Sequence, residues 1–485
     1  MTDFKFKTKP LPHQEIEFID HWEEPGRALF WEMGVGKTKP VIDSAAYLYR
    51  RGRVGGMLVV APKGVEQNWH WDELPKHMPD AVRWRSFLWS TERRGTKKFK
   101  AELKEFLKFS GCQVLCMSYD AMMTDDAAAT AKAFLQQRPR IYVADETTRI
   151  KTPGAKVTKR MLASAKYAPY RRIFNGTPAS DNPFHVYSQL KFVDPDVWKR
   201  ELDIPNFLGF KGYFGSWVEL QRRDTGQKFS KLVKYRNLDR LNEIVDKYGT
   251  RLLKTDVVNL PPKVYSKVYF ELSPKQRKVY KQLEDEFRAE LSGDLTITAD
   301  IVIARMVRLQ QVCAGHVPSD QEGNLLSLCS PNPRIQALLG AVEDVRKKAI
   351  IWCKYDVEVD EVAAALTNMG RSLVTFDGRT SAADRQQAKV DFQEGCADFF
   401  IGKPSACGRG ITLTAADTVI YYSNSFVLDE RLQSEDRAHR VGQDKTVMYI
   451  DIVAKGTIDE YIINKLRSKR EVSAIVMGDD LPEWI

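Results

Sequence analysis

Long apolar runs, paired cysteines and low-complexity tracts are all missing from this chain of 485 residues. No run reaches the roughly eighteen apolar residues that a membrane-spanning helix needs. The seven cysteines form no Cys-x-x-Cys pair, so no zinc site is expected, and their odd number argues against a disulfide scaffold. The opening residues, MTDFKFKTKPLPHQ, have lysines but no apolar core, so no signal peptide is expected. These absences favour a cytoplasmic protein.

Positive charge is present in excess, with a formal net charge of +10. This balance favours a polyanionic partner such as nucleic acid, although solvated surface lysines would produce the same total. The length predicts two or three domains, and the hydrophobic fraction of 43% is typical of a globular protein.

Short β-branched or aromatic runs alternate with helix-like stretches in both halves of the chain. The clearest runs are GMLVVAP (56–62), QVLCMSY (113–119), RIYVADE (140–146), AIIWC (349–353), DTVIYY (417–422) and VMYIDIV (447–453). Such alternation indicates an α/β fold with parallel sheets. Residues 183–320 have fewer runs and more helical periodicity, and LPPK (260–263) and LCSPNPR (328–334) are breaks. The sequence therefore predicts two α/β lobes that flank a mainly helical region.

The segment WEMGVGKT (31–38) resembles a phosphate-binding loop in which Trp31 replaces the first glycine. A strand is expected before it and a helix after it, with Pro40 tolerable in the first helical turn. This arrangement presents backbone N–H groups and a helix dipole to phosphate. Lys37 would reach the β and γ phosphates, and Thr38 would ligate Mg²⁺. A glycine turn with a chance Lys-Thr is the alternative.

The run IYVADE (141–146) is an apolar strand that ends in two carboxylates. Asp145 at a strand end can hold Mg²⁺, and Glu146 beside it can orient or deprotonate an attacking water. A surface acidic pair that closes a buried strand would look the same. The phosphate loop upstream favours the catalytic interpretation.

Two arginines lie three residues apart in QSEDRAHRVGQ (433–443), on one face of an expected helix. Arg437 and Arg440, supplied from the second lobe, could stabilise the charge of γ-phosphoryl transfer. An exposed basic helix turn is the alternative.

In this order, these elements resemble helicase superfamily two, and the chain resembles its SWI/SNF-type (sucrose-nonfermenting) ATPases over nearly its whole length. The matching segments in the first half are LPHQ (11–14), EMGVGKT (32–38), VVAPKGVEQNW (59–69), MSYD (117–120), DETTRIK (145–151) and NGTPASDNP (175–183). Those in the second half are IIWCKY (350–355), FDGRTSAADRQQAKVDFQ (376–393), KPSACGRGITLTAADTVIYY (403–422) and QSEDRAHRVGQ. The phosphate loop of that family also lacks the first glycine. The insertions are short and no chromatin-reading or zinc appendage is visible, so the chain resembles a minimal member of bacterial or phage type.

The resemblance implies two RecA-like parallel-sheet lobes that close over one ATP with Mg²⁺. Lobe 1 would span residues 1–255, with a helical insertion from about residue 183. Residues 256–330 would form a linker and a second helical insertion. Residues 331–485 would form lobe 2 with a C-terminal brace helix.

The same resemblance assigns the site residues. The nucleotide would be bound by Gln14, Gly34, Val35, Gly36, Lys37, Thr38 and Gly410, with Thr38 and Asp145 as ligands of Mg²⁺. Catalysis would use Lys37, Asp145, Glu146, Gln433, Arg437 and Arg440. The DNA backbone would be held by Lys63, Ser118, Tyr119, Lys354 and Ser405, although each of these could equally be an ordinary polar residue of a loop.

The resemblance implies a DNA-stimulated ATPase that translocates on double-stranded DNA and remodels bound proteins or branched DNA. It would work as a monomer in a bacterial or infected-host cytoplasm. A strand-separating helicase is a second interpretation, less favoured because no wedge hairpin is evident, and a DNA-binding assembly subunit with little ATPase activity is a third. One departure affects coupling, because Thr148 replaces a histidine that links the ATP site to DNA in that family.

Overall fold

The computed structural model describes residues 4–221, 228–292, 299–318, 325–345, 347–407 and 411–479. These residues form two compact units, each built on its own sheet. Unit 1 draws on Met1–Ser216, Lys234–Asn259 and Val472–Asp480, and unit 2 on Trp217–Val233 and Leu260–Glu471.

Unit 1 is built on a seven-stranded sheet in the order β3-β4-β2-β5-β6-β1-β9, and every neighbouring pair of strands is parallel. The strands are β1 (Gly26–Trp31), β2 (Gly56–Ala61), β3 (Trp84–Leu88), β4 (Cys112–Ser118), β5 (Ile141–Asp145), β6 (Tyr170–Phe174) and β9 (Gly249–Leu252). Central strands such as β2 are buried at every position, as near-continuous apolar runs in a parallel sheet should be.

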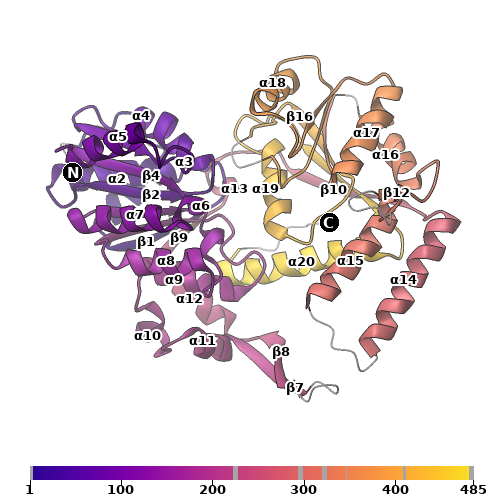
Figure 1. The fold of residues 1–485 in the computed structure, drawn as a ribbon, viewed down its shortest axis with the longest axis horizontal. Helices are drawn as coiled ribbons and strands as arrows, with labels where there is room; N and C mark the ends of the chain where they lie inside the picture. Colours follow the sequence, from indigo (N-terminus) through magenta and orange to yellow (C-terminus); the bar gives the residue numbers. More distant parts are fainter. Residues whose placement is uncertain are drawn as a thin grey trace. The chain divides into compact units, whose positions relative to one another are not determined.

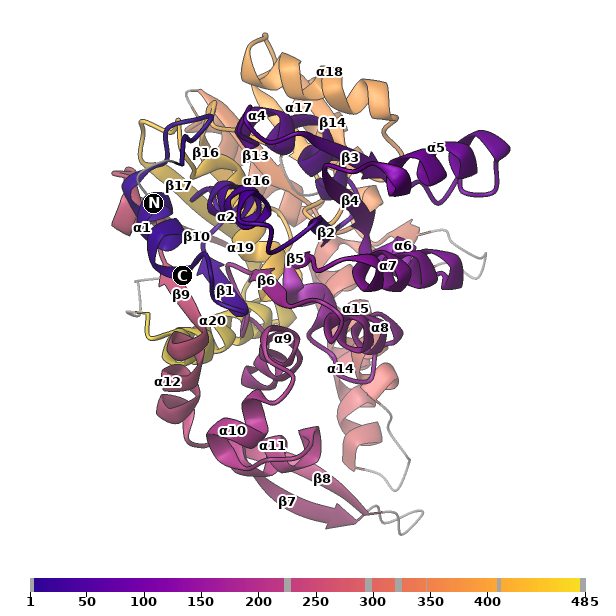
Figure 2. The same cartoon turned by 90° about the vertical axis from the view of Figure 1, so that its left-hand side faces the viewer.

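Helices cover both faces of this sheet (Figures 1 and 2). They include α1 (Pro12–His21), α2 (Thr38–Arg50), α3 (Val65–Asn68), α5 (Lys97–Lys108), α6 (Tyr119–Met122), α7 (Asp125–Gln137), α8 (Lys156–Ala165) and α9 (Val186–Val193). Parallel strands with crossover helices place all strand ends of one kind on the same edge. The loops that follow β1, β2, β4, β5 and β6 therefore meet at the carboxyl edge of the sheet.

Unit 2 is built on a six-stranded sheet in the order β10-β17-β16-β13-β15-β14, again with every pair parallel. The strands are β10 (Lys263–Phe270), β13 (Lys348–Trp352), β14 (Leu373–Phe376), β15 (Phe399–Gly402), β16 (Ala416–Tyr421) and β17 (Val447–Ala454). Its helices include α14 (Pro274–Ser292), α15 (Ala299–Ala314), α16 (Pro333–Glu343), α17 (Asp356–Asn368), α18 (Ala382–Gln393), α19 (Leu428–Ala438) and α20 (Ile458–Met477). The predicted fold, two parallel-sheet lobes with helical insertions, is confirmed.

The region between the lobes is largely helical, but it also supplies an edge strand to each sheet. It contains α10 (Val197–Leu202), α11 (Phe207–Phe214), α12 (Leu238–Tyr248) and the antiparallel pair β11 (His316–Pro318) and β12 (Leu325–Ser327). The strand β9 pairs with β1, and β10 pairs with β17. Both lie at a sheet edge, where strands are short or alternate apolar and polar residues, so their apolar signal is weak.

A two-stranded ribbon, β7 (Gly215–Gln221) and β8 (Lys228–Tyr235), follows α11. The sequence pattern did not single out this ribbon. Both strands carry polar or basic residues at many positions, so neither has the β-branched run that marks the core strands. The ribbon is visible beyond α11 in Figures 1 and 2.

The described part of the chain lacks two features. None of its helices has the length and apolar character needed to cross a membrane. It also holds no group of three or more His, Cys, Asp or Glu side chains placed to bind a metal ion.

Candidate active site

The phosphate loop joins β1 to α2 at the carboxyl edge of the unit 1 sheet, and its shape depends on two glycines. Gly34 and Gly36 have φ angles of +85° and +83°, a region that side chains with a Cβ rarely adopt. A Cβ on Gly36 would also lie 2.3 Å from the amide nitrogen of Gln14. The loop therefore needs glycine at both positions.

Trp31 shows why the first glycine of the usual pattern is dispensable. It is the last residue of β1 and is buried, and its indole Nε1 donates to Thr250 Oγ1 at 2.9 Å. Thr250 in turn donates to Glu17 at 2.8 Å. Trp31 therefore belongs to the strand and its core, and the turn begins after it.

Lys37 and Gln14 both bind the backbone of this loop. The ammonium of Lys37 donates to the carbonyls of Trp31 at 2.9 Å and Glu32 at 3.0 Å. Gln14 donates to the Gly36 carbonyl at 2.9 Å and accepts from the Leu11 N–H at 2.9 Å. A carboxamide has two N–H groups and two lone pairs on its oxygen, so these two bonds use one of each. His13 donates to the Val35 carbonyl at 2.9 Å and secures the same turn.

Asp145 ends β5 and Glu146 follows it, and β5 lies two strands from β1 with β6 between them. Neighbouring strands are about 4.8 Å apart, so β1 and β5 are separated by roughly 10 Å at this edge. That spacing leaves room for phosphates between the loop and the carboxylates. Glu146 is buried and has a φ of 54°, a strained conformation for a residue other than glycine that recurs at functional sites.

Trp69 positions Asp145, a role that the sequence did not reveal. Its Nε1 donates to Asp145 Oδ2 at 3.0 Å, and its ring stacks on Phe174 with centroids 6.0 Å apart. Trp69 is buried, whereas Trp71, two residues on, is 67% exposed. No sequence pattern could identify Trp69, because its partner lies 76 residues away.

Gln189 on α9 connects the loops that follow β5 and β6, and the sequence did not single it out. Its Oε1 accepts from Thr147 Oγ1 at 2.7 Å and from Asn175 Nδ2 at 2.6 Å. Its Nε2 donates to the carbonyls of Pro178 at 2.8 Å and His185 at 2.9 Å. Gln189, Thr147 and Asn175 are all fully buried. One amide group therefore fixes DETT (145–148) against NGTP (175–178).

Arg437 and Arg440 lie at the end of α19 in unit 2, near a buried ionic network. Arg437 is buried and donates to the Ile411 carbonyl at 3.3 Å. Arg440 follows the helix and is half-buried, and burial lowers the pKa of its guanidinium. Gln433 is half-buried on the same helix.

The network itself centres on Arg431, which donates to both carboxylate oxygens of Asp451 at 2.6 and 3.0 Å and to Glu435 at 2.9 Å. Lys263 and Tyr265 of β10 also donate to Glu435, at 3.1 and 2.8 Å. Burial opposes ionisation of Glu435, but the charges of Lys263 and Arg431 outweigh it and lower its pKa to about 2. These contacts hold α19 against β17 and β10.

Family comparison agrees with this geometry. The SNF2-related domain family matches residues 18–316, and the helicase conserved C-terminal domain matches residues 333–442. The chain belongs to the SNF2-related family. The motif-bearing loops of its first half follow the carboxyl ends of β1, β2, β4, β5 and β6 in unit 1.

The relatives of this SNF2-related chain are considerably longer. An uncharacterized ATP-dependent helicase of Mycoplasma genitalium is 26% identical over 460 residues, which cover 94% of this chain and 40% of the helicase. A chromodomain-helicase-DNA-binding protein 1-like of Mus musculus is 27% identical, over 92% of this chain and 47% of that protein. The chain thus spans less than half the length of these curated relatives.

A solved structure, the Sulfolobus solfataricus SWI2/SNF2 ATPase core in complex with dsDNA, is also similar. Its sequence is 22% identical, with coverage of 98% of this chain and 95% of that one and a TM-score of 0.41.

The five expected DNA contacts of this SNF2-related chain differ in how accessible they are. Lys63 is exposed after β2, and with Ser118 it lines a cavity of about 660 Å³. Ser118 is buried and its hydroxyl accepts from the Ala121 N–H at 3.0 Å, as the N-cap of α6. Tyr119 is 1% exposed, and its hydroxyl donates to the Asp145 carbonyl at 2.8 Å. Tyr119 is therefore a buried residue beside Asp145 and is not accessible to DNA in this structure.

The expected contacts of unit 2 follow β13 and β15. Lys354 is half-buried, its ammonium donates to Gln310, and burial lowers the pKa of that ammonium. Ser405 is exposed. Gly410, expected to bind nucleotide, lies outside the described residues.

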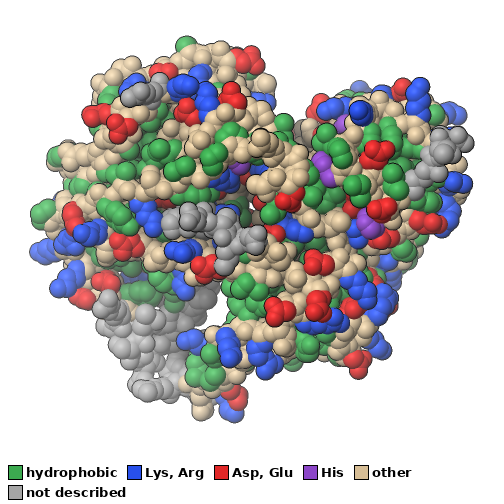
Figure 3. Space-filling model, turned by 180° about the vertical axis from the view of Figure 1, so that it is seen from behind, with side chains coloured by type: hydrophobic (Ala, Val, Ile, Leu, Met, Phe, Trp, Pro, Cys, Tyr) green, Lys and Arg blue, Asp and Glu red, His purple; other side chains and the backbone are tan. Residues whose placement is uncertain are grey.

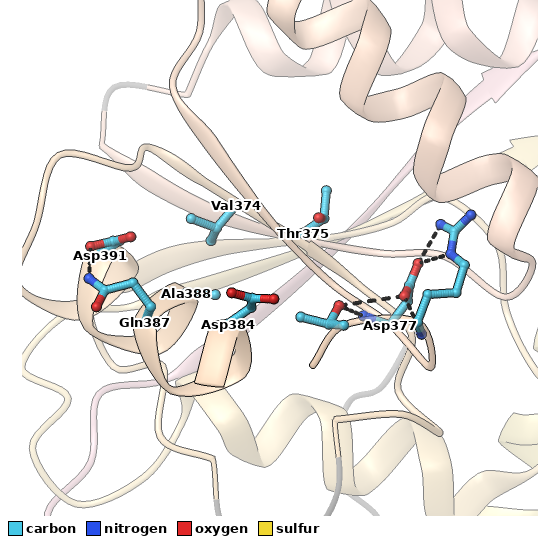
Figure 4. A pocket seen from close by; sticks show the side chains of 9 residues that line it. Val374, Thr375, Asp377, Asp384, Gln387, Ala388 and Asp391 are labelled. Atoms are coloured by element: carbon cyan, nitrogen blue, oxygen red, sulfur yellow. Dashed lines mark hydrogen bonds and ion pairs between the residues drawn. The ribbon is translucent and has the colours of Figure 1, made fainter. Parts of the chain in front are cut away.

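A second cavity, of about 460 Å³, lies beside the edge strand β14 and helix α18 (Figure 4). Three carboxylates line it, and each has a protein partner. Asp377 accepts from Arg379 at 2.9 Å, Asp391 from Gln387 at 2.7 Å and Asp384 from the Ser381 hydroxyl at 2.7 Å. We therefore assign no cation to this cavity.

Proposed function

We propose that the chain is a DNA-stimulated ATPase that translocates on double-stranded DNA and remodels protein–DNA complexes or branched DNA. The observation that carries this proposal is the joint arrangement of the phosphate loop, the Asp145–Glu146 strand end and the Gln189 connection within one buried edge of unit 1. A loop of this shape with paired carboxylates two strands away suits phosphoryl transfer from a nucleoside triphosphate to water.

In this proposal Lys37 moves from the loop carbonyls to the β and γ phosphates, and the loop N–H groups bind the remaining phosphate oxygens. Glu146 accepts a proton from the attacking water while the bond from the γ-phosphorus to the bridging oxygen breaks. ADP and inorganic phosphate are the products. Gln433, Arg437 and Arg440 of unit 2 stabilise the negative charge that develops on the γ-phosphoryl group.

Mg²⁺ would be held by the Thr38 hydroxyl and the Asp145 carboxylate. These are hard oxygen donors, and the carboxylate is already oriented by the Trp69 indole. The ion would neutralise charge on the β and γ phosphates. Replacing Asp145 with Asn should weaken Mg²⁺-dependent nucleotide binding, because one anionic ligand is lost.

Turnover of ATP with and without duplex DNA tests the proposal. We expect duplex DNA to raise turnover strongly over the rate without DNA, and Glu146→Gln to abolish both rates while nucleotide binding remains. Turnover that stays at background in the presence of duplex DNA would identify the chain instead as a DNA-binding subunit with little ATPase activity.

The strand-separating helicase remains a second candidate, because the β7–β8 ribbon is the kind of projecting hairpin that a wedge requires. A triplex-displacement assay reports translocation on duplex DNA, and a forked-duplex assay reports strand separation. We expect displacement of the third strand without unwinding of the fork. The opposite result would favour the helicase.

A further inference from the structure

The β7–β8 ribbon has an unusual composition for a surface element. Between Gly215 and Arg236 the sequence has six Lys or Arg residues and two acidic residues. Three lysines, Lys228, Lys231 and Lys234, are exposed along β8 itself. Because side chains alternate across a strand, Lys231 lies on one face and the other two lie on the opposite face. Both faces of the ribbon are therefore positively charged.

Few of these charges are neutralised by the protein. Lys228 pairs with Glu219 of β7 at 3.4 Å, a surface pair of small energy. For Lys231 and Lys234 no ion pair or side-chain hydrogen bond is found among the described residues. Elsewhere on the surface, positive and negative side chains are intermixed over the face drawn in Figure 3. The ribbon is thus a local concentration of unneutralised positive charge.

Exposed apolar side chains accompany the lysines. Val218 on β7 is 47% exposed and Val233 on β8 is 61% exposed. An isolated two-stranded ribbon gains little stability in water, so its strands must be anchored at the base. Here the Arg236 N–H donates to the Phe214 carbonyl at 2.9 Å, and Tyr235 packs on Phe184 with ring centroids 5.5 Å apart. The base of the ribbon is therefore anchored, while Val218, Val233 and the lysines of β8 are exposed to solvent.

We infer that the β7–β8 ribbon is an additional contact for duplex DNA, separate from the loops at the carboxyl edges of the sheets. The major groove of B-DNA admits a two-stranded ribbon, with room for apolar contacts to thymine methyl groups. Lys231 and Lys234 would then bind the phosphates on either side of the groove, a contact that fixes position without reading sequence. This inference rests on the proposed action on duplex DNA.

The affinity for duplex DNA of the double variant Lys231→Ala/Lys234→Ala tests the inference. A labelled blunt duplex is titrated with the full chain over a range of salt concentrations. Each lost phosphate contact should reduce the slope of log affinity against log salt by about 0.9, and affinity should fall roughly eightfold per lysine near 0.1 M salt. Turnover without DNA should match the wild type, because both lysines are exposed and remote in sequence from the phosphate loop.

A charge-matched control is Lys104→Ala/Lys108→Ala on α5, which removes two exposed lysines from another surface. We expect this control variant to keep nearly the wild-type slope of log affinity for duplex DNA against log salt concentration. The inference is overturned if the ribbon variant binds duplex like the wild type, if the control loses as much slope, or if only single-stranded binding falls. A wild-type chain whose turnover does not respond to duplex DNA contradicts the proposed function itself. If duplex DNA stimulates turnover of the wild type but the ribbon variant binds duplex DNA as tightly as the wild type, only the inference about the ribbon is contradicted.

Discussion

Gln189 is the residue that connects the loops following β5 and β6 of unit 1. Its side-chain amide makes four hydrogen bonds inside a fully buried region, two to Thr147 and Asn175 and two to backbone carbonyls. Buried polar groups of this kind specify one geometry when all are satisfied, and they are costly when one partner is removed. The family that the chain resembles has a histidine where this chain has Thr148, and that histidine links the ATP site to DNA. Because it is missing here, we expect the adjoining Thr147–Gln189–Asn175 connection to transmit changes between the loops.

Gln189→Leu should slow hydrolysis more than it weakens nucleotide binding. The substitution leaves the Thr147 hydroxyl and Asn175 amide without their acceptor, at a cost of about 1–3 kcal/mol for each buried group. Steady-state kinetics should show a lower kcat with a smaller change in KM, and thermal unfolding reports the loss of stability.

Gln113→Leu is the matched control for that substitution. Gln113 is an equally buried glutamine of unit 1 that bonds to Phe106, Arg138 and Arg140, away from the catalytic loops. It should lower stability by a similar amount and leave kcat near the wild-type value. Equal effects of the two variants on kcat would show that Gln189 has only a structural role.

Arg440→Ala should retain ATP binding and lose hydrolysis by about 10³-fold or more, if the arginine stabilises the transferring phosphoryl group. Arg467→Ala, on the exposed face of α20, removes a similar charge and should have no effect. Single-turnover hydrolysis with a separate nucleotide-binding measurement distinguishes the two steps. Wild-type turnover by Arg440→Ala would exclude this role.

At the level of elements, α19 depends on a buried ionic network for its position. Arg431, Glu435 and Asp451 are almost completely buried, and Lys263 approaches Glu435 from β10. Replacement of a buried ion pair by apolar residues is often harmless, but removal of one partner is strongly destabilising. The helix that bears Gln433 and Arg437 is therefore held by charge as well as by packing.

Glu435→Gln should destabilise unit 2 by about 3–5 kcal/mol, because Arg431 and Lys263 lose an anionic partner in the interior. Glu471→Gln, in an exposed pair with Arg467, should change stability by about 1 kcal/mol or less. Chemical denaturation of both variants measures the difference. A comparable small effect in both would contradict the importance of the network.

The lowered pKa of Glu435 predicts that the stability of the fold depends on pH. Its pKa is about 2 in the folded chain and 4.5 ordinarily, so the folded state binds the proton less tightly than the unfolded state. The stabilisation is therefore complete above pH 4.5 and is lost as the pH falls towards 2. Unfolding free energies measured across this window should fall less steeply in Glu435→Gln than in the wild type.

For the molecule as a whole, the net charge of +10 and the proposed phosphate contacts make DNA binding a salt-dependent property. A protein with six to ten phosphate contacts loses about 10³–10⁵ in affinity between 50 and 200 mM salt. We expect a comparable loss in an anisotropy titration with duplex DNA, and turnover without DNA should change little over the same range. Affinity that is insensitive to salt would argue against backbone recognition.

The sequence by itself determined the fold class and the family, and it marked the glycine turn and the two carboxylates as candidate site residues. Those features depend on local patterns such as apolar runs, glycine turns and short motifs, which neighbouring residues encode. The sequence missed β9 and β10 as edge strands and the β7–β8 ribbon, where the apolar signal is weak. Nor did it show that Tyr119 is buried, with its hydroxyl on the Asp145 carbonyl, because that burial comes from tertiary packing and not from its own motif.

Only the tertiary structure decided which distant residues support the site. Trp69 reaches Asp145 across 76 residues, Gln189 reaches Thr147 across 42, and Trp31 reaches Thr250 across 219. The order of strands in the sheet brings these pairs together, and strand order is set by the packing of whole helices and strands. The local sequence determines which groups each loop presents to a ligand. The order of strands in the sheet determines which distant side chains hold that loop in position.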